Sequence, residues 1–443
     1  MKESISIERI DYLSSCLSKS LLKTLELSKE SRVFGGNEEK LFILHILRYI
    51  NDGDINFDNK VISNYKNGGL KTFYDVYSNA IKNRKNFLKV IYRLIKIKPF
   101  LHIKSIFNIL FAPVIVSFDQ APYCKKNVVL NLSVYFLRFI RPSKKLRNKF
   151  IKNLIEVGLN EDLAKIFSWH FPRSHLEGFK FFRYISSKCN EKKIILSNIY
   201  VCQHDPIVSF LSMNKSTRLI YIQHGGGYGF NEDRIDYQIE YNGASKMLFW
   251  GSGDQNVFQT RFRYKNFLNS KNTVSLITSM RFTSKEKIKT YENVFSSLKG
   301  CSQSNNFKIC VYPSFKNSIK SKDINISYGI TNRAHEQNKI VIYDSIGSTL
   351  LFSRLSMRKP FLVIDNFPVK YQSDNAKKMI NLFYDAGVLI KENQLHDELK
   401  KLLEVNSHEL EYFFNKRTQK LLNYFHSLPK IEILIDNELK RFE

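Results

Sequence analysis

The sequence lacks several of the motifs by which common enzyme classes are recognised. Only 2 of its 443 residues are Trp, and its 6 Cys form neither a CxxC pair nor a Cys/His cluster with zinc spacing. Free thiols in a reducing compartment are therefore expected. Neither a Walker A sequence nor a complete Gly-x-Gly-x-x-Gly occurs, so the sequence predicts neither a P-loop nor the standard dinucleotide fingerprint.

Long hydrophobic runs are also missing. The first residues, Met1–Ile5, have no apolar segment of the signal-peptide type. The most apolar stretches, Leu41–Ile50 and Phe107–Phe118, contain charges or are too short to cross a bilayer. A cytoplasmic protein is therefore expected. Because RRM, zinc-finger and basic-heptad patterns are absent as well, nucleic acid is not an expected partner.

Positive charge is abundant, with a formal net charge of +28. One interpretation is attraction to an anionic partner, and the other is a general bias of a chain rich in Lys, Asn and Ile. The charge is spread along the chain rather than concentrated in one block. Among anionic partners, a peripheral contact with the inner membrane is the more specific expectation.

Strand and helix patterns alternate through most of the chain, which predicts an α/β fold. Residues 1 to about 110 have mostly helical patterns, including a basic amphipathic stretch at Asn86–Lys96. We expect two Rossmann-like domains facing a central cleft, as in a GT-B glycosyltransferase. Residues 1–270 would form the first domain with the helical N-terminal region on the acceptor side. Residues 271–443 would form the nucleotide-binding domain.

The segment Tyr221–Gly229, with the sequence YIQHGGGYG, is the most informative part of the chain. A strand pattern at 218–223 runs into glycines, and Asn231 is a candidate helix N-cap after them. Glycine lets backbone amides approach an anion closely. We therefore predict that Gly225, Gly226, Gly227 and Tyr228 line a ligand site.

The same His-Gly-Gly-Gly sequence occurs in lipases and esterases, where it forms an oxyanion hole. Those enzymes need a Gly-x-Ser-x-Gly nucleophile segment, which this chain does not contain. Ester hydrolysis is therefore disfavoured. Asp52-Gly53-Asp54 resembles a metal-binding Asp-x-Asp but lies in an Asn/Asp/Gly-rich turn, so no metal ion or other cofactor is expected.

A second polar turn follows the strand pattern at 339–343. Ser345, Ser348 and Thr349 lie where this strand becomes a helix. Hydroxyls and amides at a helix N-terminus bind phosphate well, although the same residues also serve as plain helix caps. Three further residues, Glu177, Asp205 and His224, are candidates for a catalytic base that accepts the proton of an acceptor hydroxyl. Surface or capping roles remain open for all three.

Several segments together resemble a family of bacterial surface-polysaccharide transferases of O-antigen or capsule assembly. The resemblance covers about residues 165–405. It is carried by Phe171-Pro172 to Glu177-Gly178, Leu196-Ser197-Asn198, Gln223 to Gly229, Trp250-Gly251, Ser348-Thr349, Lys359-Pro360 and Phe383 to Ile390.

The resemblance implies a metal-independent GT-B glycosyltransferase that transfers a sugar from a nucleotide donor, such as a CMP-linked ulosonic acid, to a glycan or lipid-linked acceptor. Ser348 and Thr349 would then hold nucleotide phosphate, and His224 would face the donor. One departure is Phe352-Ser353-Arg354, where related sequences carry a glutamate that can meet the ribose. A CDP-glycerol-type phosphotransferase and a non-catalytic assembly protein with a degenerate cleft remain alternatives.

Overall fold

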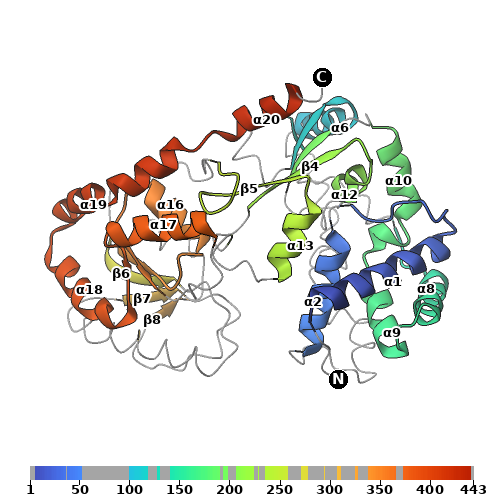
Figure 1. The fold of residues 1–443 in the computed structure, drawn as a ribbon, viewed down its shortest axis with the longest axis horizontal. Coiled ribbons are helices and arrows are strands. Elements are labelled where there is room, and N and C mark those ends of the chain that lie inside the picture. The colour runs from blue at the N-terminus through green and yellow to red at the C-terminus, as the bar shows by residue number, and fades with distance from the viewer. Residues whose placement is uncertain are drawn as a thin grey trace. The chain divides into compact units, whose positions relative to one another are not determined.

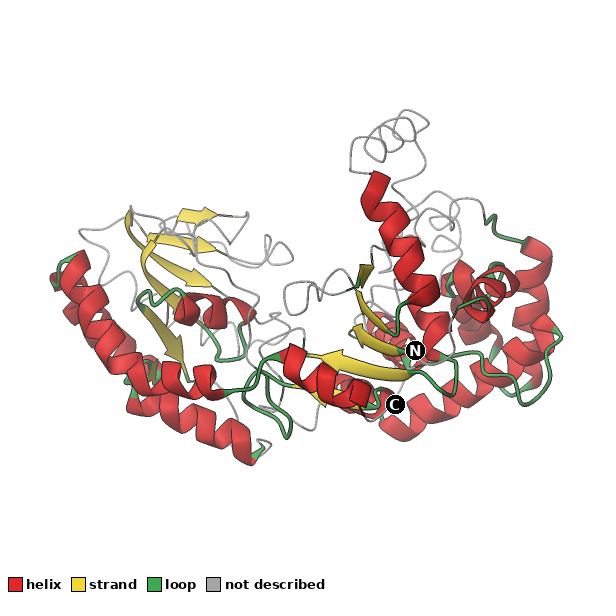
Figure 2. Ribbon diagram, turned by 90° about the horizontal axis from the view of Figure 1, so that it is seen from above, coloured by secondary structure: helices red, strands yellow, loops and turns green. Residues whose placement is uncertain are grey.

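The chain folds as two compact units. A computed structural model describes residues 5–35, 37–51, 99–117, 127–129, 140–189, 193–197, 206–223, 228, 235–257, 271–277, 294, 307–310, 325–327, 338–365 and 373–440. Unit 1 comprises Met1–Ile222 and Arg234–Met247, and unit 2 comprises Gln223–Asp233 and Leu248–Glu443. Figures 1 and 2 show that each unit has its own strands with helices around them.

Unit 1 is built on a five-stranded sheet with the order β2-β1-β3-β4-β5. Neighbours from β2 to β4 pair in parallel. This is the flavodoxin-like order of doubly wound α/β domains, in which the strand order reverses between β1 and β3. The strands are β1 (Val114–Ser117), β2 (Val128–Val129), β3 (Ile194–Ser197), β4 (Arg218–Ile222) and β5 (Lys246–Leu248).

Helices make up most of the rest of unit 1. Serine and asparagine side chains cap several of them: Ser6 accepts a hydrogen bond from Arg9 N, and Ser143 accepts one from Leu146 N. The helices are α1 (Ile7–Leu25), α2 (Glu38–Asn51), α6 (Pro99–Phe111), α8 (Lys144–Glu156), α9 (Glu161–His170), η2 (Arg173–His175), α10 (Phe179–Ser187), α12 (Pro206–Ser212) and α13 (Ile235–Gly243).

Unit 2 contains a six-stranded parallel sheet with the order β11-β10-β9-β6-β7-β8. Renumbered from its first strand, this is the 3-2-1-4-5-6 order of the Rossmann fold, with the reversal between β6 and β9. The strands are β6 (Lys271–Ile277), β7 (Phe307–Cys310), β8 (Asn325–Ser327), β9 (Asn338–Tyr343), β10 (Phe361–Ile364) and β11 (Leu389–Ile390).

Both faces of this second sheet are covered by helices. On one face, alternate strand residues such as Ile340, Ile342 and Leu362 pack against Leu395 and Leu399 of α18. On the other face, the Phe361 ring contacts aromatic rings of α17 and α19. The helices of unit 2 are α16 (Thr349–Ser356), α17 (Asp374–Asp385), η6 (Glu392–Gln394), α18 (Leu395–Glu404), α19 (Ser407–Ser427) and α20 (Ile431–Lys440).

The predicted α/β class with two Rossmann-like domains is confirmed. All strands of the second sheet follow residue 270, and residues 223–233 and 248–270 group with unit 2. No strand is predicted from the sequence at the central strand β6, because its first residues, Lys271–Thr273, are polar. Its Ser275 is fully buried and accepts a hydrogen bond from the Asn338 side chain. The candidate N-cap Asn231 lies outside the described residues.

Candidate functional site

The predicted Ser/Thr turn lies at the point where the strand order of unit 2 reverses. Asp344 follows β9, and its amide donates to the carbonyl of Ile277 at the end of the neighbouring strand β6 at 3.2 Å. In open α/β sheets, ligands bind outside the carboxyl ends of the strands at this reversal. Ser345 and Ser348 are therefore placed where such a fold holds its ligand.

The hydroxyl of Ser348 does not cap its own helix. Ser348 is the N-cap residue of α16, with extended backbone, yet its side chain makes no capping hydrogen bond. By contrast, the Ser345 hydroxyl accepts a hydrogen bond from Gly347 N at 3.0 Å and so shapes the turn. Both serines are buried. Thr349 is the first residue of α16, where the helix dipole favours negative charge.

The glycine loop is described at its two ends. His224 and Gly225–Gly227 lie outside the described residues. Gln223 is buried before the loop, and its backbone amide donates to the carbonyl of Leu248 at 3.0 Å. After the glycines, the carbonyl of Tyr228 accepts a hydrogen bond from the Ser252 hydroxyl at 2.5 Å. Both ends of the loop are thus attached to residues 248–252.

Residues 248–252, to which both ends of the loop are attached, include a tight turn at Gly251. The Gln223 side-chain oxygen accepts a hydrogen bond from Trp250 N at 2.9 Å. Gly251 has a φ of +97°, and a Cβ there would lie 3.1 Å from carbons of both Tyr424 and Phe425. The Tyr424 hydroxyl donates to the Gly251 carbonyl at 2.6 Å. The turn that contains Gly251 therefore anchors the glycine loop.

One aromatic contact joins this turn to the helix that carries the Ser/Thr turn. The Trp250 and Phe352 rings meet edge-on with centroids 5.7 Å apart, and Phe352 packs in the same way against Phe425. Trp250 is fully buried and Phe352 is buried. The anchor of the glycine loop and α16 therefore share one packed core within unit 2.

The sequence departure at residues 352–354 lies on the buried side of α16. Arg354 is fully buried, and its guanidinium donates to the carbonyls of Pro360, Asn338 and Lys339 at 3.2, 2.6 and 3.2 Å. Burial lowers the pKa of Arg354 to about 10. Its described contacts join the start of β9 to the residue before β10, so it acts as a structural clamp.

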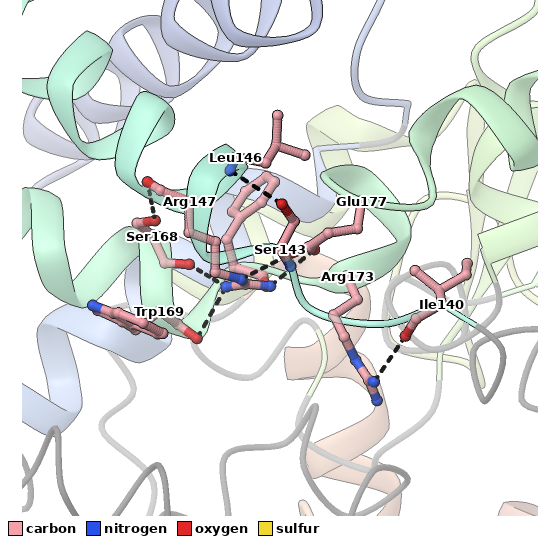
Figure 3. Close-up of polar contacts among 9 residues, drawn as sticks. Ile140, Ser143, Leu146, Arg147, Ser168, Trp169, Arg173 and Glu177 are labelled. Carbon is pink, nitrogen blue, oxygen red and sulfur yellow. Dashed lines mark hydrogen bonds and ion pairs between the residues drawn. The ribbon is translucent and has the colours of Figure 1, made fainter.

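Glu177, one of the candidate bases, is held in a buried ion pair in unit 1 (Figure 3). Its Oε1 accepts from Arg147 Nε at 2.8 Å and from Ser143 N at 3.0 Å, and its Oε2 accepts from Arg147 Nη2 at 3.0 Å. Arg147 also donates to the carbonyls of Ser168, Trp169 and Phe171. These contacts hold neighbouring segments of unit 1 together. The catalytic role of Glu177 stays a prediction.

The other two candidate bases, Asp205 and His224, lie outside the described residues. In sequence, Asp205 precedes α12 after β3, and His224 follows Gln223 after β4. These two strands pair in parallel, so both residues come after the carboxyl ends of neighbouring strands. Their roles stay predictions. In the described part of the chain, no group of three or more His, Cys, Asp or Glu side chains could hold a metal ion.

A buried polar cluster in unit 1 was not predicted. His175 Nδ1 lies 3.0 Å from the Ser174 hydroxyl, and its Nε2 lies 3.1 Å from the Ser209 hydroxyl. Ser209 donates in turn to Glu38 Oε1, which also accepts from Gly35 N at 3.2 Å. The cluster connects the N-terminus of α2 with η2 and α12. Its residues are far apart in sequence, and only the Glu38-Glu39 pair opening an apolar helix gave a local signal.

Burial keeps this cluster uncharged near neutral pH. It raises the pKa of Glu38 to about 8, with a smaller contribution from the neighbouring Glu39. It also lowers the pKa of His175 to about 4. A protonated carboxyl and a neutral imidazole can hydrogen-bond without a buried charge. The cluster therefore positions α12, the helix that directly follows Asp205.

Solved structures of similar arrangement include nucleotide-binding enzymes. A mutant of S. aureus TarM, in complex with fondaparinux, alpha-GlcNAc-glycerol and UDP, is 14% identical over 59% of this chain and 58% of that chain (TM-score 0.40). The S. aureus MnaA–UDP structure is 10% identical over 71% and 95% (TM-score 0.38). Spinosyn rhamnosyltransferase SpnG with thymidine diphosphate is 9% identical over 74% and 99% (TM-score 0.37).

The chain spans less than two thirds of the length of the TarM structures. No curated protein matches it by sequence. The family comparison is the decisive one, because the model of the LIC12162 family transferase matches residues 45–294, which is more than half of the chain. This chain therefore belongs to the LIC12162 family of transferases.

Proposed function

We propose that this transferase is a glycosyltransferase of bacterial surface-polysaccharide assembly that uses a nucleotide-activated sugar. The donor phosphates would lie at the N-terminus of α16, against Ser348, Thr349 and the glycine loop. The observation that carries the proposal is the position of the Ser/Thr turn, since it follows β9 where the strand order of unit 2 reverses.

Two features of the turn support phosphate binding over plain capping. The Ser348 hydroxyl makes no capping hydrogen bond, so it is available to a ligand oxygen. The ends of the glycine loop are attached to the turn at 250–252, whose Trp250 packs against Phe352 of α16. Backbone amides of glycines and of a helix N-terminus are the groups that bind phosphate without a metal ion.

For the donor we propose a CMP-linked ulosonic acid, and for the acceptor a growing O-antigen, lipopolysaccharide or capsule glycan, held on a lipid at the cytoplasmic side of the membrane. The sequence resemblance supports this choice. The excess of Lys and Arg suits an acidic sugar donor, since both the sugar carboxylate and the phosphate are anionic. His224, Asp205 and Glu177 remain the proposed candidates for the base.

Calorimetric titration with CMP, CDP, UDP and GDP tests the proposal. We expect binding of CMP that is weakened about tenfold or more by Ser348→Ala and by His224→Ala, since each removes a group next to the phosphates. Ser356→Ala is the matched control, because its hydroxyl bonds the Ser353 carbonyl at 2.8 Å at the far end of the same helix.

The other outcomes point elsewhere. A preference for CDP over CMP would favour a CDP-glycerol-type phosphotransferase on the same scaffold. Absence of binding to all four nucleotides would contradict both enzymes and favour an assembly protein without a donor site. If chelation of divalent metal ions abolished transfer, the metal-independent mechanism would be wrong.

A further inference from the structure

Helix α6 of unit 1 exposes three large apolar residues, while two of its polar residues are buried together with Ile109. Ser105 and Asn108 are buried, at 1% and 5% exposure. Ile106, Phe107 and Phe111 are exposed by 48%, 62% and 61%. A helix at the edge of a soluble domain normally turns its apolar stripe inward. The exposed face of α6 therefore requires an explanation.

Two of the exposed apolar residues, Phe107 and Phe111, form a contiguous aromatic pair. The rings of Phe107 and Phe111, one helical turn apart, are 4.8 Å apart between centroids. Ile106 lies beside Phe107 on the same helix, which packs near β2 and is drawn in cyan in Figure 1. Contiguous exposed apolar surface of this kind marks a binding face, because isolated exposed residues would need no partner.

The sequence around α6 is exclusively basic among its charged residues. Between Asp75 and Asp119 there is no Asp or Glu. The same interval contains eight basic residues: Lys82, Arg84, Lys85, Lys89, Arg93, Lys96, Lys98 and Lys104. An anionic and apolar partner therefore suits the sequence of this stretch, of which Lys104 lies on α6 itself. An anionic phospholipid surface has both properties, since acyl chains lie directly beneath charged headgroups.

The size of α6 determines how it can meet a bilayer. Its 13 residues measure about 20 Å at 1.5 Å per residue, short of the roughly 30 Å hydrocarbon core. Among the described residues, no helix is long and apolar enough to cross a membrane. A helix with exposed aromatic residues and a basic flank lies along the interface instead of spanning it.

We propose that the exposed face of α6 docks unit 1 on an anionic phospholipid surface, with Phe107 and Phe111 inserted between the lipids. This inference names the surface by which the proposed transferase would contact the membrane. It does not depend on which nucleotide sugar is the donor. A second copy of the chain is a less suitable occupant, because each copy carries only basic charges in this stretch of sequence and a formal net charge of +28 overall.

Vesicle sedimentation of the full chain without nucleotide tests this proposal. Vesicles of phosphatidylcholine mixed with phosphatidylglycerol are compared with phosphatidylcholine alone. We expect binding only with phosphatidylglycerol, and a fall of at least about tenfold in partitioning for the double variant Phe107→Ser, Phe111→Ser. The control is Tyr412→Ser, Phe413→Ser, a pair of α19 that is also exposed, at 74% and 51%.

A second measurement reports insertion directly. In Phe107→Trp, the new indole should shift its emission to shorter wavelength on phosphatidylglycerol vesicles and be quenched by brominated lipid chains. Equal vesicle binding by the wild type and the Phe107/Phe111 double variant would overturn the proposal. So would a wild-type dimer that the double variant converts to a monomer, since α6 would then be a contact between copies. Neither result bears on nucleotide titration. Failure of the lipid-binding proposal can therefore be distinguished from failure of the proposed function.

Discussion

Unit 1 buries carboxyl and imidazole groups where its helices meet, whereas unit 2 buries an arginine between strand ends. In unit 1, Arg147–Glu177 and the Glu38–His175 cluster connect elements distant in sequence. In unit 2, Arg354 reaches back to carbonyls at the start of β9 and before β10. The first arrangement pairs ionisable side chains with one another, in addition to the hydrogen bonds from Arg147 to backbone carbonyls. The described hydrogen bonds of Arg354 go to backbone carbonyls.

The buried groups of these two arrangements titrate in different pH ranges. The shifted pKa values of Glu38 and His175 lie at about 8 and about 4, so those groups of unit 1 titrate differently from an unfolded chain within this range. Arg354 of unit 2 has a pKa of about 10 and is charged throughout it. Of these buried groups, those of unit 1 therefore make stability depend on pH near neutrality.

The largest expected effect comes from breaking the ion pair of unit 1. Glu177→Ala leaves the Arg147 guanidinium buried without its carboxylate, which costs about 3–5 kcal/mol of unfolding free energy. Denaturant unfolding measures this. Glu156→Ala is the control, since it removes an exposed partner of Lys23 and should cost less than about 1 kcal/mol. Unchanged stability of Glu177→Ala together with lost transfer would show instead that Glu177 is catalytic.

The next effect is the pH dependence of unit 1. The folded-state pKa of Glu38 is raised from 4.5 to about 8, so the folded state retains a proton that the unfolded chain has lost. Its contribution to stability is therefore present below pH 4.5 and falls as pH rises toward about 8. At about 1.4 kcal/mol per pKa unit, the loss is on the order of a few kcal/mol.

Glu38→Gln should remove most of this alkaline loss, because the amide cannot ionise. His175 acts on the acid side: its lowered pKa means that stability falls as pH drops from 6.5 toward about 4. Unfolding midpoints measured across this range in wild type and Glu38→Gln check both signs. Parallel curves for the two proteins above pH 6 would show that Glu38 is already ionised in the folded state.

A smaller effect is expected from the buried arginine of unit 2. Arg354→Met keeps most of the side-chain volume but leaves the carbonyls of Asn338 and Pro360 without their donor, at about 1–3 kcal/mol. The loss should be the same at pH 5 and pH 8. Arg358→Met, in the exposed turn after the same helix, should change stability by less than about 0.5 kcal/mol. A pH-dependent loss in Arg354→Met would remove the contrast between the units.

The sequence predicted those parts of the fold that rest on local apolar runs. The run of four apolar residues Phe361–Ile364 forms β10, and Asn338–Tyr343 forms β9, one residue longer than predicted. The central strand β6 could not be recognised, because Lys271, Asn272 and Thr273 open it and Ser275 is buried in its middle. Pairing with the neighbouring strands β7 and β9, and not the local sequence pattern, makes this segment a strand.

The same distinction holds for the candidate site. The Ser/Thr turn has a local signature and occurs where predicted, and the turn at Trp250-Gly251 is marked locally by its glycine. Their connection through Phe352 had none, because that contact depends on how α16 packs. The Glu38–Ser209–His175 cluster was missed for the same reason: its members lie in three separate elements. Local sequence can thus indicate the turns of a site but not the contacts that hold them together.

The smallest predicted effect concerns the hydrogen bond that attaches the end of the glycine loop to Ser252. Ser252→Ala removes the hydroxyl that holds the Tyr228 carbonyl at the end of the glycine loop, which costs about 1 kcal/mol of stability. Ser356→Ala removes a comparable bond within α16 and should cost a similar amount. Only Ser252→Ala should also weaken nucleotide binding in calorimetry, since only its bond positions the glycines. If both variants bound nucleotide as the wild type does, the attachment of the loop to residue 252 would be structural alone. The donor site would then depend on the α16 turn without the glycine loop.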